Sequence, residues 1–159
     1  MKTESRIHRH KTIFNNSLEP ESAVYATVED QVWKQDFDLE VLVTRHLGNN
    51  HYLLISIPHL IYGYQRLDVV QVNPDTQIIE NLVHRSRNTS VRLTFAQDIE
   101  VIKAEEVIKE LIDFGFVVDP YNKFMISIDL DEENSRERIK LKMNILIGES
   151  KIYDWEYII

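Results

Sequence analysis

The stretch VRLTFAQDIEVIKAEEVIKELIDFGFVV, residues 91–118, contains the patterns that decide the fold class. Val91–Phe95 is typical of a short strand. Residues 104, 107, 108, 111 and 112 are apolar and fall on one face of a helix, and Gly115 stands where a helix C-cap belongs. The stretch predicts a strand, a helix and, over residues 116–118, a second strand.

The residues that follow this stretch continue the alternation of strands and helices. Residues 124–130 and 151–158 are typical of strands. The turn residues Asp119-Pro-Tyr-Asn122 favour a hairpin that joins 116–118 to 124–130. One segment between the last two strands, residues 132–147, is harder to assign.

Residues 132–147 fit two patterns. Alternate residues from Ile139 to Ile147 are apolar without a break, which favours a strand. Asp131 as an N-cap, the acidic residues that follow it, and Gly148 as a C-cap favour a helix instead. We favour the helix, which gives the order β-α-β-β-α-β of a ferredoxin-like unit over residues 90–159.

The N-terminal half has a different pattern, in which short runs of β-forming residues are separated by turn residues. Two hairpins are predicted, one at Gly48-Asn49-Asn50 and one at Asn73-Pro-Asp-Thr-Gln77. The five predicted strands cover residues 23–28, 39–44, 51–57, 68–72 and 78–83. No helical pattern lies between them, so we expect a small antiparallel sheet or barrel over residues 23–86.

Residues 1–22 carry basic groups and irregularly spaced apolar residues, which is typical of a mobile tail. We interpret His8 and His10 as part of a solvated basic arm and not as a metal site. The predicted fold class is therefore α+β: a tail, a small antiparallel β sheet or barrel, and a ferredoxin-like βαββαβ unit.

The composition excludes several classes of protein. The chain has 159 residues, 43% of them apolar, and no cysteine. We therefore expect a globular fold without disulfides, thiolate zinc sites or cysteine nucleophiles. No run approaches the roughly 20 apolar residues of a spanning helix, and the N-terminus lacks the apolar region of a signal peptide. These features predict a cytoplasmic protein that does not bind membranes.

The formal charge of −8 is distributed unevenly along the chain. Residues 1–96 carry 10 basic and 11 acidic residues, whereas residues 97–159 carry 8 basic and 15 acidic residues, a net charge of −7. Nucleic-acid binding relies on a basic surface, so nucleic acid is not an expected partner. An acidic surface favours a basic protein partner instead.

Four short motifs stand out between residue 48 and the end of the chain. They are GNNHYLLISIP at 48–58, Tyr62-Gly63 followed by Leu67-Asp-Val-Val70, SRNTSVR at 86–92, and Asp154-Trp-Glu-Tyr157. In this order the chain resembles a bacterial family known as domain-of-unknown-function family 4265, over residues 23–158. It departs from the family pattern at Leu67, where family members often have glycine. The resemblance implies a bacterial, two-part α+β protein, with no reaction attached.

The sequence lacks the motifs of several enzyme classes. There is no Gly-x-Ser-x-Gly elbow, and the four glycines are too far apart for a phosphate-binding loop. A calcium loop that begins at Asp129 would need glycine at its sixth position and a carboxylate at its twelfth, where this chain has Asn134 and Lys140. His46, His51 and His84 could form a base or metal cluster, but half-exposed polar residues at strand ends explain them better. We expect no enzymatic activity, no cofactor and no metal.

Arg85, Arg87 and Arg92 form the one basic stretch outside the tail. Such a stretch can hold a phosphate or a carboxylate. It can also be a connector whose arginines pair with the acidic second half of the chain. We favour the connector.

The predicted function is that of a non-catalytic acidic protein that binds a basic protein partner. The candidate that this profile favours is an immunity protein, which neutralises a basic bacterial toxin by occluding its active site. Tyr153, Trp155 and Tyr157 are candidate anchors, with core packing as the alternative, above all for Trp155. The predicted partner-binding residues are Glu105, Glu106, Asp131, Glu132, Glu133, Asp154 and Glu156.

A second function stays open at this point. A small-molecule-binding sensor or a small enzyme could use the cleft between the two parts, with residues 85–92 and the nearby histidines as its polar groups.

Overall fold

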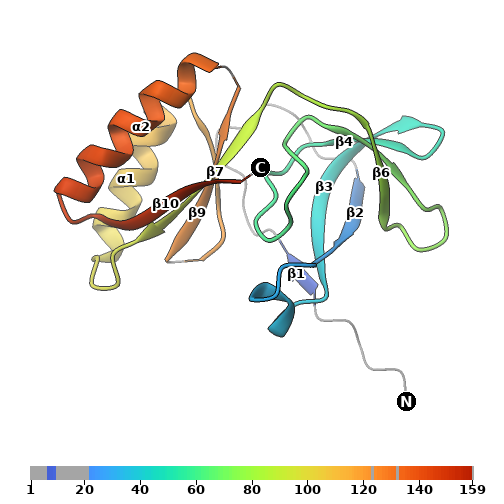
Figure 1. Ribbon diagram of the computed structural model, residues 1–159, viewed down its shortest axis with the longest axis horizontal. Coiled ribbons are helices and arrows are strands. Elements are labelled where there is room, and N and C mark those ends of the chain that lie inside the picture. The colour runs from blue at the N-terminus through green and yellow to red at the C-terminus, as the bar shows by residue number, and fades with distance from the viewer. Residues whose placement is uncertain (1–6, 10–21, 123, 132, 159) are drawn as a thin grey trace. The chain divides into compact units, whose positions relative to one another are not determined.

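The structure, a computed structural model, describes residues 7–9, 22–122, 124–131 and 133–158 (Figure 1). It is an α+β fold with two sheets and two α-helices, which confirms the predicted fold class at this level. The chain divides into two compact units, the first ending at Ser86 and the second beginning at Arg87. None of the helices in these residues has the length and apolar composition needed to cross a membrane.

The first unit is built from strands, with one short 3-10 helix at Trp33–Gln35. Its strands are β1 (Ile7–Arg9), β2 (Ser22–Thr27), β3 (Leu39–Gly48), β4 (His51–Leu54), β5 (Val69–Val72) and β6 (Ile79–His84). Five of them are antiparallel neighbours in the order β2-β3-β4-β5-β6, and β1 pairs with β3 in parallel.

Both predicted hairpins are present in this sheet. Gly48, Asn49 and Asn50 connect β3 to β4 with φ angles of 96°, 52° and 60°, a conformation that glycine and asparagine reach at low cost. In the turn between β5 and β6, the side-chain oxygen of Asn73 accepts a hydrogen bond from the N–H of Asp75 at 2.8 Å. These turns fix the register of the strands that they join.

The sheet curls until β2 approaches the start of β6. The backbone N–H of Tyr25 donates to the carbonyl of Gln77 at 2.8 Å, and Tyr25 forms a parallel bridge with Ile78. The curled sheet encloses apolar side chains, among which the fully buried ones include Val24, Leu42, Leu54, Val70 and Val72. The first unit therefore has its own hydrophobic core.

One strand lies in the segment that was expected to be a mobile tail. Residues 7–9 form β1 beside residues 39–41 of β3. β4 pairs only with residues 44–48, so this edge of β3 is open to another strand. The other residues of the predicted tail, 1–6 and 10–21, lie outside the described residues.

β4 ends at Leu54, although a strand was predicted to continue to Ile57. The N–H groups of Ile55 and Ser56 both donate to the carbonyl of Val43, at 2.9 and 3.2 Å. The hydroxyl of Ser56 in turn accepts a hydrogen bond from the N–H of Val43 at 2.9 Å. Ile55 and Ser56 are therefore both opposite Val43 of β3, as in a β-bulge, and the regular pairing of β4 with β3 ends here.

The second unit is an antiparallel sheet with two helices on one face (Figure 1). Its elements are β7 (Thr89–Phe95), α1 (Val101–Asp113), β8 (Val117–Pro120), β9 (Met125–Leu130), α2 (Glu133–Gly148) and β10 (Ile152–Ile158). The strand order across the sheet is β10-β7-β9-β8. Its core contains Val91, Leu93 and Phe95 of β7 together with apolar side chains from both helices.

The segment that fitted two patterns forms helix α2, so the predicted helix is confirmed and the strand alternative is wrong. Ile139, Met143 and Leu146 are fully buried in the core at the spacing i, i+4 and i+7. Leu141 and Ile145 are 65% and 53% exposed. The alternation in the sequence arises because this helix has apolar residues on its outer face as well as its inner face.

The end of α1 also follows the prediction. Gly115 has a φ of 93°, which a residue without a side chain adopts easily. The N–H of Phe116 donates to the carbonyl of Leu111 at 3.1 Å, and the N–H of Gly115 donates to that of Ile112 at 2.8 Å. This pair of hydrogen bonds is the Schellman arrangement that closes a helix.

Candidate functional site

An apolar groove lies beside the N-terminal half of α1. It has a volume of about 260 Å³ and is lined by Phe95, Gln97, Ile99, Val101, Ala104, Glu105, Ile108, Asn122 and Phe124. Val101 is 66% exposed and Phe124 is 43% exposed. Large apolar side chains that line a groove and remain this exposed are typical of a surface that binds another molecule.

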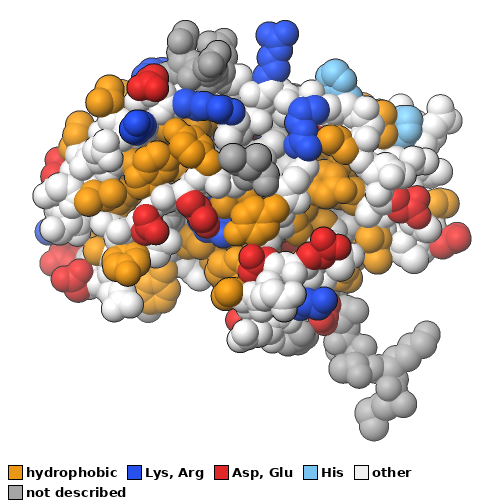
Figure 2. All heavy atoms as spheres, viewed as in Figure 1, with side chains coloured by type: hydrophobic (Ala, Val, Ile, Leu, Met, Phe, Trp, Pro, Cys, Tyr) orange, Lys and Arg blue, Asp and Glu red, His pale blue; other side chains and the backbone are white. Residues whose placement is uncertain are grey.

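The rim of this groove is acidic. Asp98 and Glu100 are exposed and alternate along the chain with the lining residues Gln97, Ile99 and Val101, and the exposed Glu105 lines the groove itself. Glu106, also exposed, follows on α1, and Lys103 is the basic residue within 97–106. On the face shown in Figure 2, acidic and hydrophobic side chains lie next to one another over the second unit.

The predicted partner-binding residues are distributed over several elements. Glu105 lines the groove and Glu106 is exposed on the same helix. Asp131 is exposed after β9, and Asp154 is exposed on β10. Glu132 and the side chain of Glu133 lie outside what the structure describes. Of this set, Glu105 therefore lies at the groove and Glu106 lies next to it in the sequence.

Glu156 has an ion-pair partner in its own unit. Its carboxylate lies 3.0 Å from the guanidinium of Arg92, whose side chain is 6% exposed. The contact joins two neighbouring strands, since Glu156 and Arg92 are paired residues of β10 and β7. A carboxylate held in this way is less available to a partner protein.

The Arg92–Glu156 pair belongs to a polar row across the sheet face opposite the helices. Cross-strand pairing continues from Arg92 to Ser127 of β9 and from Ser127 to Asp119 of β8. Ser127 and Asp119 are fully buried. Sequence reasoning missed this row, although the alternation of apolar and polar residues in β7 and β9 was its signal.

Of the predicted aromatic anchors, one is exposed and two contact the core. Tyr153 is 76% exposed. Trp155 and Tyr157 pack against the hydrophobic core of the second unit, with their rings in an edge-to-face arrangement at 5.2 Å. The alternative of core packing is therefore correct for Trp155 and applies to Tyr157 as well.

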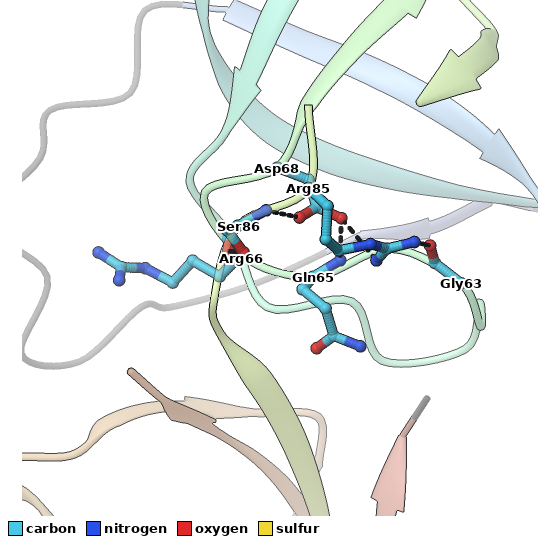
Figure 3. A network of polar contacts seen from close by, with 6 residues as sticks. All are labelled: Gly63, Gln65, Arg66, Asp68, Arg85 and Ser86. Atoms are coloured by element: carbon cyan, nitrogen blue, oxygen red, sulfur yellow. Dashed lines mark hydrogen bonds and ion pairs between the residues drawn. The ribbon is translucent and has the colours of Figure 1, made fainter. Parts of the chain in front are cut away.

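Arg85 pairs within the first unit, so the expected pairing with the acidic second half is wrong for this residue. Its guanidinium lies 3.0 Å from the carboxylate of Asp68, and it also donates to the carbonyl of Gly63 at 2.8 Å (Figure 3). The same carboxylate accepts hydrogen bonds from the backbone N–H groups of Gln65 and Ser86, at 2.8 and 2.7 Å. This network ties the loop before β5 to the end of β6.

The histidines have separate settings. His46 contacts the ring of Tyr52 with 4.8 Å between centroids, and His84 is exposed at the end of β6. His59 is fully buried, and its backbone N–H donates to Glu40. Within the described residues, no group of three histidine, aspartate or glutamate side chains is placed to hold a metal ion.

The chain belongs to the family described as "Domain of unknown function (DUF4265)", which matches residues 40–153. This confirms the family suggested by the four motifs. No curated protein matches the chain.

A solved structure titled "Novel crystal structure of a hypothetical protein from Neisseria gonorrhoeae" is similar to this fold, with a TM-score of 0.67 and 11% sequence identity. The alignment covers 87% of this chain and 94% of that one. At this identity the similarity shows the shared fold and assigns no function.

Proposed function

We propose that the protein is a non-catalytic cytoplasmic binding protein whose groove beside α1 receives an apolar side chain from a basic segment of a partner protein. The observation that carries this proposal is the combination of an apolar groove with an acidic rim. Val101 and Phe124 supply exposed apolar surface, and Glu105 supplies a carboxylate at the same site.

Each half of this combination has a separate role in binding. Burial of one apolar side chain in the groove contributes about 1.5–3 kcal/mol before the cost of association. The acidic rim adds attraction for lysine and arginine, and the net charge of −7 on residues 97–159 increases the rate of encounter with a basic protein. An acidic or neutral partner gains neither this attraction nor the faster encounter.

An immunity protein is the narrower form of this proposal. The groove and its rim would then lie against the basic active site of a toxin and exclude its negatively charged substrate. The acidic charge supports this form, and it stays a prediction because it needs a toxin as the partner. Loss of the toxin's activity on addition of equimolar protein would test it directly.

The test uses proteins that co-purify with the tagged full-length chain from the parent cells. Glu105→Lys with Glu106→Lys should abolish retention of the basic partner, and Val101→Ser should weaken it. Asp113→Lys at the other end of α1 and Leu141→Ser on α2 are matched controls, because both residues are exposed and lie outside the groove. If all four variants retain the partner equally, or if the retained partner is acidic, the proposal is wrong.

We also infer that the second unit is a ferredoxin-like βαββαβ unit. Numbered in chain order, its strands lie in the order 4-1-3-2 with antiparallel neighbours, which supports this assignment. The position of both helices on one face supports it as well. Proteins of this architecture have many functions, so the assignment explains the position of the groove and not its ligand.

A further inference from the structure

A second cavity lies in the first unit, where β2 and β6 approach the loop that follows β4. Its volume is about 450 Å³, within the range of small-molecule sites. It is lined by Ala26, Thr27, Glu29, Asp30, Ile61, Tyr62, Tyr64, Ile79 and Glu80. Among the described residues, the lining combines apolar, tyrosine and carboxylate side chains and contains no lysine or arginine.

The tyrosines give this cavity aromatic surface that solvent can reach. Tyr62 is 41% exposed and Tyr64 is partly exposed. The face of a tyrosine ring carries partial negative charge and attracts cations within about 6 Å of its centre. Aromatic walls together with carboxylates are the chemistry that recognises ammonium and guanidinium groups.

The carboxylates differ in how they are held. Asp30 accepts hydrogen bonds from the N–H groups of Val32 and Trp33, at 2.9 and 3.2 Å, and so begins the 3-10 helix. Glu80 accepts one from the side chain of Asn73 at 2.8 Å, which leaves lone pairs on both of its oxygens. Glu29 is exposed. Glu29 and Glu80 are therefore the carboxylates best placed to meet a ligand.

The charges around Tyr64 also favour a cationic ligand in this cavity. Burial raises the pKa of its phenol above the usual 10.0, and the negative charge of Glu29 adds to this rise. The ring therefore remains neutral at physiological pH. Arg85 lowers this pKa, but by less than Glu29 raises it, so the charges around the phenol together favour a cation over an anion.

We propose that this cavity binds an organic cation, with the ammonium or guanidinium group between Tyr62, Tyr64 and Glu29. This site lies in a different unit from the groove beside α1, and it does not depend on the function proposed for that groove. The cation can be a free small molecule or a lysine or arginine side chain of a polypeptide, which share this chemistry.

The test is a titration of the full-length, isotope-labelled protein followed by NMR chemical shifts. The probes are N-acetyl-arginine amide, tetramethylammonium and, as a neutral match for the first, N-acetyl-citrulline amide. We expect the two cations to shift the amides of residues 26–30, 61–64 and 79–80 with a dissociation constant on the order of 1 mM. The citrulline derivative should produce no saturable shift.

Variants assign the binding to the cavity. Tyr62→Leu should weaken binding roughly two- to fivefold, and Glu29→Gln with Glu80→Gln should weaken it by a similar or larger factor. Tyr153→Leu and Glu137→Gln are matched controls at exposed residues of the second unit and should leave binding unchanged. Circular dichroism of each variant shows that the fold is retained.

The two sources of the cation are distinguished by a pentapeptide, Gly-Ser-Arg-Ser-Gly, blocked at both ends. Tighter binding of the peptide than of the arginine amide identifies a polypeptide ligand, and equal binding identifies a free small molecule. The proposal is wrong if neither cation shifts these amides at about 20 mM. It is also wrong if citrulline binds as tightly as arginine, or if the cavity variants bind like the controls.

Discussion

The guanidinium of Arg85 lies 3.0 Å from the carboxylate of Asp68, 17 residues earlier in the chain, and this carboxylate is fully buried. Arg85 itself is 48% exposed. The pair is therefore a buried anion covered by a half-exposed cation. It holds the loop of residues 63–67 against the end of β6.

Asp68→Ala should lower the free energy of unfolding by about 2–5 kcal/mol, because it removes the carboxylate that accepts from the N–H groups of Gln65 and Ser86. Urea unfolding followed by circular dichroism measures the change. Asp75→Ala, at an exposed turn residue, is the control and should stay within about 0.5 kcal/mol of the wild type. A small effect at Asp68 would show that the network does not stabilise the fold.

Arg85→Gln should cost less, about 1 kcal/mol, because the guanidinium is half exposed and water replaces part of its interaction. The same urea unfolding measurement tests whether Arg85→Gln costs less stability than Asp68→Ala. Unchanged stability together with lost binding of an anionic ligand would restore the interpretation of Arg85 as a ligand-binding residue.

Glu40→Gln should destabilise the first unit by about 2 kcal/mol or more. The carboxylate of Glu40 is fully buried and accepts hydrogen bonds from the N–H groups of His59, Leu60 and Ile61, at 2.6, 2.9 and 3.2 Å. Glutamine keeps the shape but turns an amide donor toward these donors. Amide hydrogen exchange at residues 59–61 should accelerate in the variant, and unchanged exchange would contradict this role.

Met143→Ala should lower the free energy of unfolding by about 2–5 kcal/mol, whereas Leu141→Ala should change it by less than about 0.5 kcal/mol. Met143 is fully buried in the core and Leu141 is 65% exposed. A strand would bury both residues on the same face and make both variants costly. Thermal melts of the two variants therefore test the helical assignment of 133–148 as well as the packing.

Local signals explain which parts of the fold could be predicted from the sequence. The face of α1 repeats at i, i+3 and i+4, and Gly115 ends the helix through its own backbone conformation. The turn at Gly48-Asn49-Asn50 depends likewise on residues within it. Each of these features is decided by neighbours in the chain, and no knowledge of the tertiary fold is needed to find it.

The polar contacts depend on tertiary structure and could not be predicted in this way. Glu40 stands in an alternating strand, and nothing in that pattern shows that the loop at 59–61 will bury its carboxylate. Asp68 meets Arg85 only because β5 and β6 pair in one register. The groove beside α1 was missed because Val101 lies outside the apolar face of the helix that packs on the core.

The titration of Tyr64 should be displaced to higher pH than that of an exposed tyrosine. Burial and the negative charge of Glu29 both raise the pKa of its phenol above 10.0, and together they outweigh the lowering effect of Arg85.

This raised pKa makes the stability of the protein depend on pH. In the unfolded chain the same phenol loses its proton near the ordinary value. Above that pH the unfolded state binds fewer protons than the folded state, so the free energy of unfolding falls as the pH rises. The stabilising contribution of Tyr64 is complete below pH 10.0 and is lost as the pH passes through the raised pKa.

Ultraviolet absorbance at the tyrosinate band measures this titration in the folded protein. Tyr64→Phe should remove the late-titrating component and flatten the fall in stability with pH. Tyr153→Phe, at an exposed tyrosine, is the matched control and should leave the late-titrating component in place. Glu29→Gln should bring the Tyr64 component back toward pH 10.0 without removing it, because the effect of burial remains. If the late-titrating component survives in Tyr64→Phe, it does not belong to Tyr64. If Glu29→Gln leaves this component unmoved, Glu29 does not interact electrostatically with Tyr64 as the cation site requires.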